Sequence, residues 1–90
     1  MIKIGKKQIG RYVILNVFRG KEGEAKMGIT VSRRFGKAHE RNRFKRVVRE
    51  AYRYLRHHLP EGMVINVRPR TLASTATPAD IIQEIMSLTD

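Results

Sequence analysis

Hydrophobic residues predict β-strands in three short segments of the chain, residues 12–18, 26–32 and 63–68. Residues 26–32 alternate with a period of two, because successive side chains of a strand point to opposite faces, and residues 12–18 are β-branched and aromatic with glycines on either side. In the second segment, Met27, Ile29 and Val31 form the predicted core face. The first segment is partly apolar on both faces, which favours a strand covered on two sides. Its two faces consist of Val13, Leu15 and Val17 and of Tyr12, Ile14, Asn16 and Phe18.

Residues 38–59 follow a longer period, in which apolar residues recur every three or four positions. That spacing predicts a helix with one stripe facing a core. The stripe consists of Phe44, Val47, Val48, Ala51, Leu55 and Leu59, and the opposite side carries Asn42, Lys45, Arg46, Arg49, Arg53 and Arg56. Pro60 ends the helix. The order strand, helix, strand predicts a crossover between parallel, neighbouring strands, with the helix on one face of the sheet.

The two ends of the chain have different patterns. Residues 1–10 are basic and polar with two glycines, and we expect little structure there. Residues 70–77 contain small residues and are predicted to be a linker. Thr77-Pro78-Ala79-Asp80 is typical of a helix start, because Thr caps, Pro fits the first helical position and an acid suits the first turn. We expect the following helix to pack on the sheet through Ile81, Ile82, Ile85 and Leu88.

These elements predict one α/β (α+β) domain over residues 1–90, with a small mixed sheet of three to four strands. The net charge is +11, and residues 33–58 hold ten of the nineteen Lys and Arg against two acids, Glu40 and Glu50. No cysteine is present, which excludes disulfides and thiolate metal sites and is compatible with a reducing cytosol. No signal peptide or membrane span is evident. Such a basic chain favours nucleic acid as a partner, with an anionic membrane second.

The charge pattern of the long helix indicates an external anion. Arg41, Lys45, Arg49 and Arg53 form three like-charge pairs four residues apart, which together cost about 1 kcal/mol in an isolated helix. Arg41 and Arg43 also lie near the helix start, where the helix dipole disfavours cations. Phosphate would remove both penalties. The alternative is an ordinary solvated helix face, although such faces usually mix charges of both signs.

Candidate catalytic groups are poor. His39, His57 and His58 lie on or near the basic helix, and His39 and its neighbour Glu40 point in different directions on a helix. The two adjacent histidines match no zinc pattern. Residues 20–23 are expected in a hairpin-like turn and not in a phosphate-binding loop before a helix. The sequence therefore indicates a binding protein.

Two segments carry a family resemblance. Residues 28–38 read Gly-Ile-Thr-Val-Ser-Arg-Arg-Phe-Gly-Lys-Ala, and Arg-Asn-Arg-Phe-Lys-Arg follows at 41–46, with Arg49-Glu50 and Val67-Arg68-Pro69 beyond. They resemble the signature region of the protein subunit of bacterial ribonuclease P, whose hallmark is an Arg-Asn-Arg motif opening the long helix.

The resemblance implies a fold like domain 2 of ribosomal protein S5, with a left-handed crossover. It also implies binding to a catalytic RNA that removes the 5′ leader of precursor tRNA with Mg²⁺ held through the RNA, no cofactor on the protein alone, and a cytoplasmic location. The residues that match the RNA-facing motif are Arg41, Asn42, Arg43, Lys45, Arg46 and Arg49, which the helix projection extends with Arg53 and Arg56. Thr30, Ser32, Arg33 and Arg34, with Ile14 and Asn16 beside them, match a cleft for the single-stranded leader.

The chain departs from the family pattern in three places. Asn16 stands where a Tyr is frequent, and His39 where a Val is frequent. Family members usually begin with a further helix whose phenylalanines form the other wall of the leader cleft, whereas this sequence starts just before its first predicted strand. We expect either a start downstream of the natural one or weaker leader binding. A structural RNA-binding protein, such as a small ribosomal protein, remains the alternative function, and a binder of anionic membranes is a weaker one.

Overall fold

The computed structural model describes residues 6–20, 23 and 25–89. Its strands are β1 (Lys6–Ile9), β2 (Val13–Arg19), β3 (Lys26–Ile29) and β4 (Met63–Pro69). Its helices are α1 (Ala38–Leu55) and α2 (Pro78–Thr89), with two short 3₁₀ helices, η1 (Arg33–Phe35) and η2 (Thr71–Thr75). The predicted α+β class is confirmed, with a mixed sheet of four strands.

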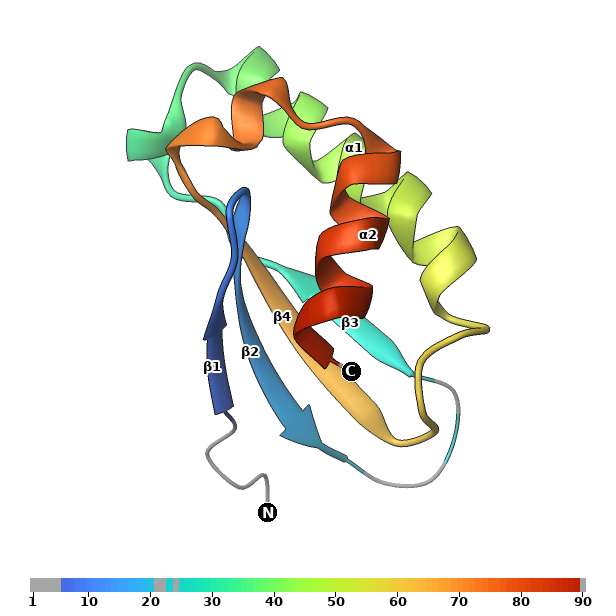
Figure 1. Ribbon diagram of the computed structural model, residues 1–90. Coiled ribbons are helices and arrows are strands. Elements are labelled where there is room, and N and C mark those ends of the chain that lie inside the picture. Colours follow the sequence, from blue (N-terminus) through green and yellow to red (C-terminus); the bar gives the residue numbers. More distant parts are fainter. Residues whose placement is uncertain (1–5, 21–22, 24, 90) are drawn as a thin grey trace.

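The strands lie in the order β1-β2-β4-β3 (Figure 1). Strand β4 is antiparallel to β2 and parallel to β3, so β3, α1 and β4 form the predicted crossover between parallel neighbours. The expectation of a hairpin-like turn at residues 20–23 is wrong, because β4 separates the two strands that this segment joins. Gly62 instead bridges its ends: it accepts a hydrogen bond from Gly20 N–H and donates one to Gly23 O. Its φ of 77° is one that glycine adopts without strain.

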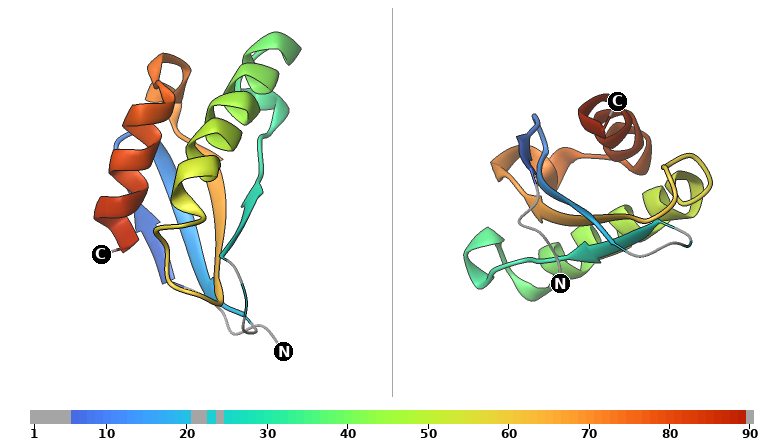
Figure 2. Two further views of the ribbon diagram at one scale, coloured as in Figure 1. Left: turned by 90° about the vertical axis from the view of Figure 1, so that its right-hand side faces the viewer. Right: turned by 90° about the horizontal axis from the view of Figure 1, so that it is seen from below.

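The core lies between one face of the sheet and the two helices. The sheet contributes Val13, Leu15, Ile65 and Val67, and α1 contributes the predicted stripe, with Leu59 just beyond its end. Helices α1 and α2 contact each other over this core (Figure 2). Both pack on the same sheet face, because the buried residues of β2, β4, α1 and α2 belong to one core cluster. The opposite face carries Ile14, Asn16 and Phe18, which are only partly buried, so the expectation that β2 is covered on two sides does not hold.

Several boundaries differ from the sequence expectations. Residues 6–9 form β1, so the prediction of little structure in the first ten residues is wrong for this part, while residues 1–5 lie outside the described ones. The segment predicted as a linker contains η2 and buries Ala73 and Ala76. Helix α1 ends at Leu55, and turns continue toward Pro60. Strand β3 ends at Ile29 and not near residue 32, although Thr30 N–H still donates to Val67 O at 3.0 Å.

Helix α2 starts where its sequence predicts. Thr77 Oγ1 accepts a hydrogen bond from Asp80 N–H, and the Asp80 carboxylate accepts one from Thr77 N–H, which is a reciprocal cap. Ile81 and Ile85 are fully buried, with Ile82 and Leu88 packed around them.

One carboxylate ties α2 to the turn between β1 and β2. Glu84 accepts hydrogen bonds from the backbone N–H groups of Arg11 (2.6 Å), Tyr12 (2.8 Å) and Val13 (2.9 Å). The turn itself closes with Gly10 N–H donating to Val13 O. A side chain at Gly10 would meet the Glu84 carboxylate, because a Cβ there would lie 2.5 Å from its Cδ. A helix at one end of the chain thereby holds a turn near the other end.

Candidate nucleic-acid interface

The outward side of α1 carries four basic residues and one amide, which we call the basic face: Asn42, Lys45, Arg46, Arg49 and Arg53. Because the core stripe fixes how α1 rolls on the sheet, this row is turned to solvent. Lys45 is half-buried and the other four are exposed.

The basic face has little internal charge compensation. Arg53 Nη1 lies 3.9 Å from Glu50 Oε1, but both side chains are mostly exposed, so the pair contributes little stability. Arg46 and Arg49 make no ion pair with a described carboxylate. The helix start adds to the imbalance, since its N-cap residue is Lys37, which makes no side-chain capping bond. This arrangement fits an external polyanion.

The end of α1 is organised by short polar and aromatic contacts. Arg56 Nε donates to His57 Nε2 at 3.1 Å. The Tyr54 and His58 rings stack with centroids 4.0 Å apart, and His58 Nδ1 lies 2.8 Å from Tyr54 O. Arg56, which was predicted among the RNA-facing residues of the helix, lies in the turn that follows Leu55.

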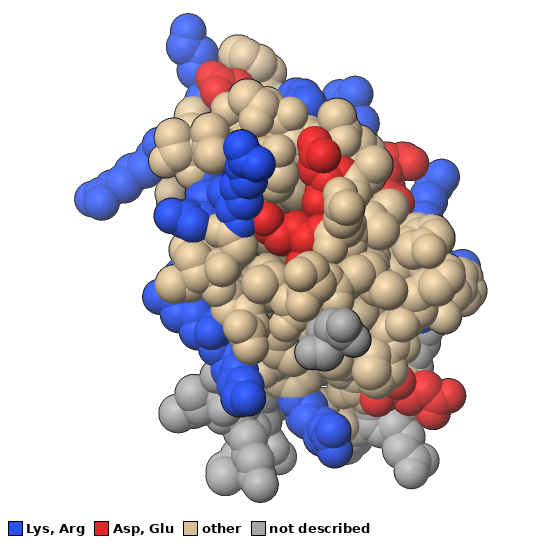
Figure 3. All heavy atoms as spheres, viewed as in Figure 1, with Lys and Arg blue, Asp and Glu red and all other residues tan. Residues whose placement is uncertain are grey.

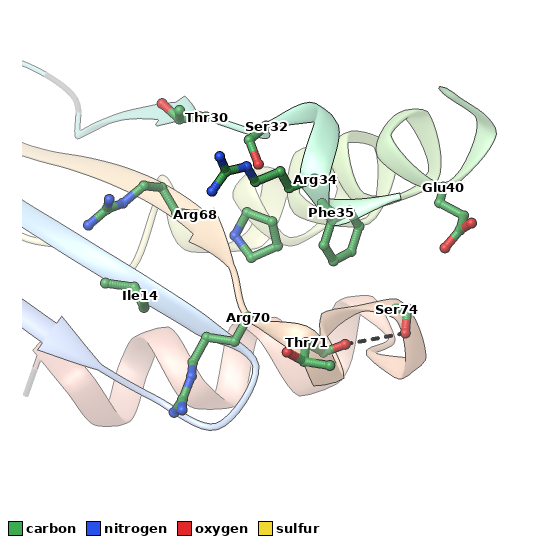
Figure 4. A pocket seen from close by; sticks show the side chains of 11 residues that line it. Ile14, Thr30, Ser32, Arg34, Phe35, Glu40, Arg68, Arg70, Thr71 and Ser74 are labelled. Atoms are coloured by element: carbon green, nitrogen blue, oxygen red, sulfur yellow. Dashed lines mark hydrogen bonds between the residues drawn. The ribbon is translucent and has the colours of Figure 1, made fainter. Parts of the chain in front are cut away.

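A cleft of about 660 Å³ opens where the carboxyl ends of β3 and β4 meet η1 and η2 (Figure 4). Its lining residues are Ile14, Thr30, Ser32, Arg34, Phe35, Glu40, Arg68, Pro69, Arg70, Thr71 and Ser74. The lining thus combines three guanidinium groups, one carboxylate and four hydroxyl groups with the apolar side chains of Ile14, Phe35 and Pro69. That mixture offers donors for phosphate and apolar surface for a base or sugar.

The walls of the cleft are fixed by contacts behind them. Phe35 of η1 packs its ring on Phe44 of α1, with centroids 5.6 Å apart. Arg70 Nη1 donates to Gly10 O at 2.6 Å, which holds its side chain beside the β1–β2 turn. Thr30 Oγ1 donates to Asn66 Oδ1 at 3.1 Å.

Arg68 lines the cleft and has one side-chain donor that makes no hydrogen bond to the described residues. Its Nε is buried and has no hydrogen-bond partner among the described residues. A buried N–H that lacks a partner is costly. Because Nε is buried, an external acceptor can reach it only if the Arg68 side chain moves.

The structure brings four of the predicted cleft residues together, Ile14, Thr30, Ser32 and Arg34. Asn16 lies further along the same open sheet face, opposite Asn66 in the register, and does not line the cleft. Arg33 is exposed in η1 but also lies outside the lining.

Sequence reasoning missed the contributions of Arg68 and Arg70. Arg68 lies on the open face of a strand that was predicted, next to Ile14 in the register. Alternation along that strand could have found it. Arg70 had no such signal, because it follows the strand and η2 was not expected.

Of the two arginines of the Arg-Asn-Arg motif, Arg41 is half-buried near the helix start and Arg43 points toward η2. The Arg43 guanidinium donates to Ser74 O at 3.1 Å and to Ala76 O at 3.2 Å. An RNA contact by Arg43 stays a prediction.

Charge is distributed unevenly over the surface. Figure 3 shows the face on which α2 lies: most Lys and Arg project along its margins, one basic group reaches inward beside acidic residues, and uncharged residues cover much of the rest. Within the described ranges, no three His, Cys, Asp or Glu side chains lie close enough together to hold a metal ion. In the same part of the chain, no helix is long and apolar enough to cross a bilayer.

This fold and these two surfaces define a small α+β domain whose exposed charge and cleft suit a polyanion. The family model described as Ribonuclease P matches residues 1–90, and the chain therefore belongs to the ribonuclease P protein family.

The relatives agree with this assignment. The chain is 63% identical over 43 residues to the ribonuclease P protein component of Chlamydia pneumoniae, a match covering 48% of this chain and 31% of that protein. With the protein component of Chlamydia felis, the match is 54% over 57 residues, covering 62% and 41%. The chain thus spans well under half the length of these curated relatives.

Solved structures match over a longer part of the chain. The ribonuclease P protein of Thermotoga maritima superposes with a TM-score of 0.82 at 30% identity, covering 94% of this chain and 81% of that one. The Staphylococcus aureus protein gives 0.75 at 27% identity, covering 93% and 77%.

Proposed function

We propose that this chain is the protein subunit of a bacterial ribonuclease P and assists the endonucleolytic removal of the 5′ leader from precursor tRNA. In this proposal the basic face of α1 binds the catalytic RNA, and the cleft holds the single-stranded leader. The RNA carries the chemistry, and Mg²⁺ reaches the reaction through the RNA. The protein works in the cytoplasm, with the RNA subunit and the precursor tRNA as its partners.

The observation that carries the proposal is the one-sided charge of α1. Lys45, Arg49 and Arg53 are like charges four residues apart, which destabilises a helix. In addition, the exposed Arg46 and Arg49 have no ion-pair partner among the described carboxylates. Neutralisation by phosphates removes this repulsion and releases counterions from the RNA, which drives binding. Arginine suits this task because its planar fork can donate two parallel hydrogen bonds to one phosphate.

The leader is assigned to the cleft because of its chemistry and its shape. Arg34, Arg68 and Arg70 line it and provide positive charge. The hydroxyl groups of Thr30, Ser32, Thr71 and Ser74 also line it. Arginine and hydroxyl groups can hydrogen-bond to the sugar-phosphate backbone without selecting particular bases, which fits leaders of differing sequence.

The test is reconstitution of the chain with a bacterial ribonuclease P RNA and measurement of precursor tRNA cleavage at low Mg²⁺. We expect the protein to stimulate cleavage, because its cations substitute for part of the ionic screening that the RNA needs. An Arg46→Ala, Arg49→Ala double variant is expected to stimulate less.

If the wild-type chain binds the RNA but gives no stimulation, the structural RNA-binding alternative is favoured. If it binds no RNA, the assignment of the basic face fails.

A further inference from the structure

Arg43 is exposed on α1, and its guanidinium donates hydrogen bonds to carbonyl groups of the protein itself. It donates from Nη1 to Ser74 O and from Nη2 to Ala76 O, at 3.1 and 3.2 Å. These carbonyls lie at the end of η2 and just beyond it, before the Thr77 cap of α2. One planar group on α1 therefore holds the segment that connects the sheet to α2.

The segment held by Arg43 is a wall of the cleft. Thr71 and Ser74 of η2 line the cleft. The apolar contacts of η2 are small: Ala73 is buried, but Leu72 remains 48% exposed. A short helix with so little buried apolar surface depends more than most on polar anchors. The charged donor of Arg43 is such an anchor.

We propose that Arg43 is a positioning residue, whose guanidinium fixes the η2 wall of the cleft against α1 and so couples the RNA-binding helix to the seat of the leader strand. This inference rests on the function proposed above. It predicts that loss of Arg43 impairs leader binding more than RNA binding, although Arg43 lies within the Arg-Asn-Arg motif of the helix. An arginine that contacts RNA phosphate would show the opposite pattern.

The informative variant is Arg43→Lys, since it keeps the positive charge but cannot donate to two carbonyls from one planar group. Its matched control is Arg46→Ala, one turn away on the basic face, which removes a charge that has no described carboxylate partner. Arg43→Ala completes the set. Thermal unfolding of each purified variant establishes that it folds.

Two measurements on the assembled holoenzyme separate the roles. The first is affinity for ribonuclease P RNA as a function of salt, and the second is the ratio of affinities for precursor tRNAs with a long leader and with a leader of a single nucleotide. For Arg43→Lys we expect an unchanged salt slope and a leader-dependent ratio reduced on the order of tenfold. For Arg46→Ala we expect the slope to fall by about 0.9, with the ratio unchanged.

Hydrogen exchange in the free protein tests the clamp without RNA. The Ala76 N–H donates to Ala73 O at 3.1 Å, and its exchange should accelerate about tenfold or more in Arg43→Lys as η2 opens locally. It should not change in Arg46→Ala.

Wild-type exchange at Ala76 in Arg43→Lys would overturn the clamp, whatever RNA the protein binds. Faster exchange with an undiminished leader ratio would overturn the coupling. A reduced salt slope in Arg43→Ala without any leader effect would make Arg43 an ordinary phosphate contact. If the wild-type holoenzyme itself shows no leader dependence, the proposed leader cleft fails, and the exchange result still decides the clamp.

Discussion

Replacement of Glu84 is expected to destabilise the whole fold, because this carboxylate holds the β1–β2 turn from α2. It accepts three backbone N–H groups, of Arg11, Tyr12 and Val13. A hydrogen bond to a charged acceptor contributes roughly 1.5 to 3 kcal/mol. The Arg11 N–H is exposed and can hydrogen-bond to water when the carboxylate is removed, whereas the N–H groups of Tyr12 and Val13 are partly buried. Two such bonds at the lower value give about 3 kcal/mol for Glu84→Ala.

Glu84→Gln retains an oxygen acceptor but places an NH₂ group near backbone donors, so about 2 kcal/mol is expected. Urea unfolding followed by circular dichroism measures both. With a slope near 1 kcal/mol per M for a domain of this size, the Glu84→Ala midpoint should fall by roughly 3 M. The control is Gln83→Ala at the exposed neighbouring position of α2, expected to change stability by less than about 0.5 kcal/mol.

A double-mutant cycle sharpens the test. Gly10→Ala should be costly alone, because its Cβ would lie 2.5 Å from Glu84 Cδ, and should cost at least about 1 kcal/mol less in a Glu84→Ala background. The reasoning is refuted if Glu84→Ala costs less than about 0.5 kcal/mol, or if the two changes are simply additive.

Further predictions concern the two surfaces and the core. Raising salt from about 50 to 200 mM should weaken RNA binding roughly 500-fold if five phosphates are neutralised. Arg49→Ala should lower the slope of log affinity against log salt concentration by about 0.9, and an unchanged slope would show that Arg49 does not contact phosphate. Arg68→Ala should weaken precursor tRNA binding in a leader-dependent way while leaving RNA-subunit affinity unchanged, which filter binding with long-leader and trimmed substrates measures. Phe44→Ala should destabilise by about 3 to 5 kcal/mol, because its ring is fully buried and supports Phe35. Thr77→Ala should cost about 1 kcal/mol in thermal or urea unfolding through loss of the α2 cap.

Periodicity predicted the elements that bury a regular stripe. The α1 stripe from Phe44 to Leu55 is buried as its spacing indicated, and the alternation in residues 63–68 matches β4, which adds only Pro69. In both cases the apolar pattern alone specifies which face meets the core.

Elements that depend on distant partners were not predictable in this way. Strand β1 reads Lys-Lys-Gln-Ile, which has no apolar alternation, and it exists because it pairs with β2 at the sheet edge and because Glu84 holds the adjoining turn. Lysines are common on exposed edge strands, where they discourage further pairing. The insertion of β4 between β2 and β3 is likewise a tertiary property that local sequence does not encode.

The candidate site shows the same division. The basic face was predictable from helical spacing, because the apolar and the basic residues of α1 recur at helical intervals on opposite sides of the helix. The cleft was found only in part: Thr30, Ser32 and Arg34 came from the family resemblance, whereas Arg70 and Ser74 reach it through η2. The internal engagement of Arg43 could not be foreseen, since its carbonyl partners lie more than thirty residues away.

The unbalanced row of cations on α1 has a practical consequence for anyone handling the protein. We expect the protein to co-purify with cellular nucleic acid when cells are lysed at low ionic strength. The high salt that removes this nucleic acid also screens the repulsion among the guanidinium groups. After desalting, neither salt nor bound nucleic acid reduces this repulsion. Its melting temperature should therefore be lowest in dilute buffer and rise when either sulfate or its cognate transcript is returned.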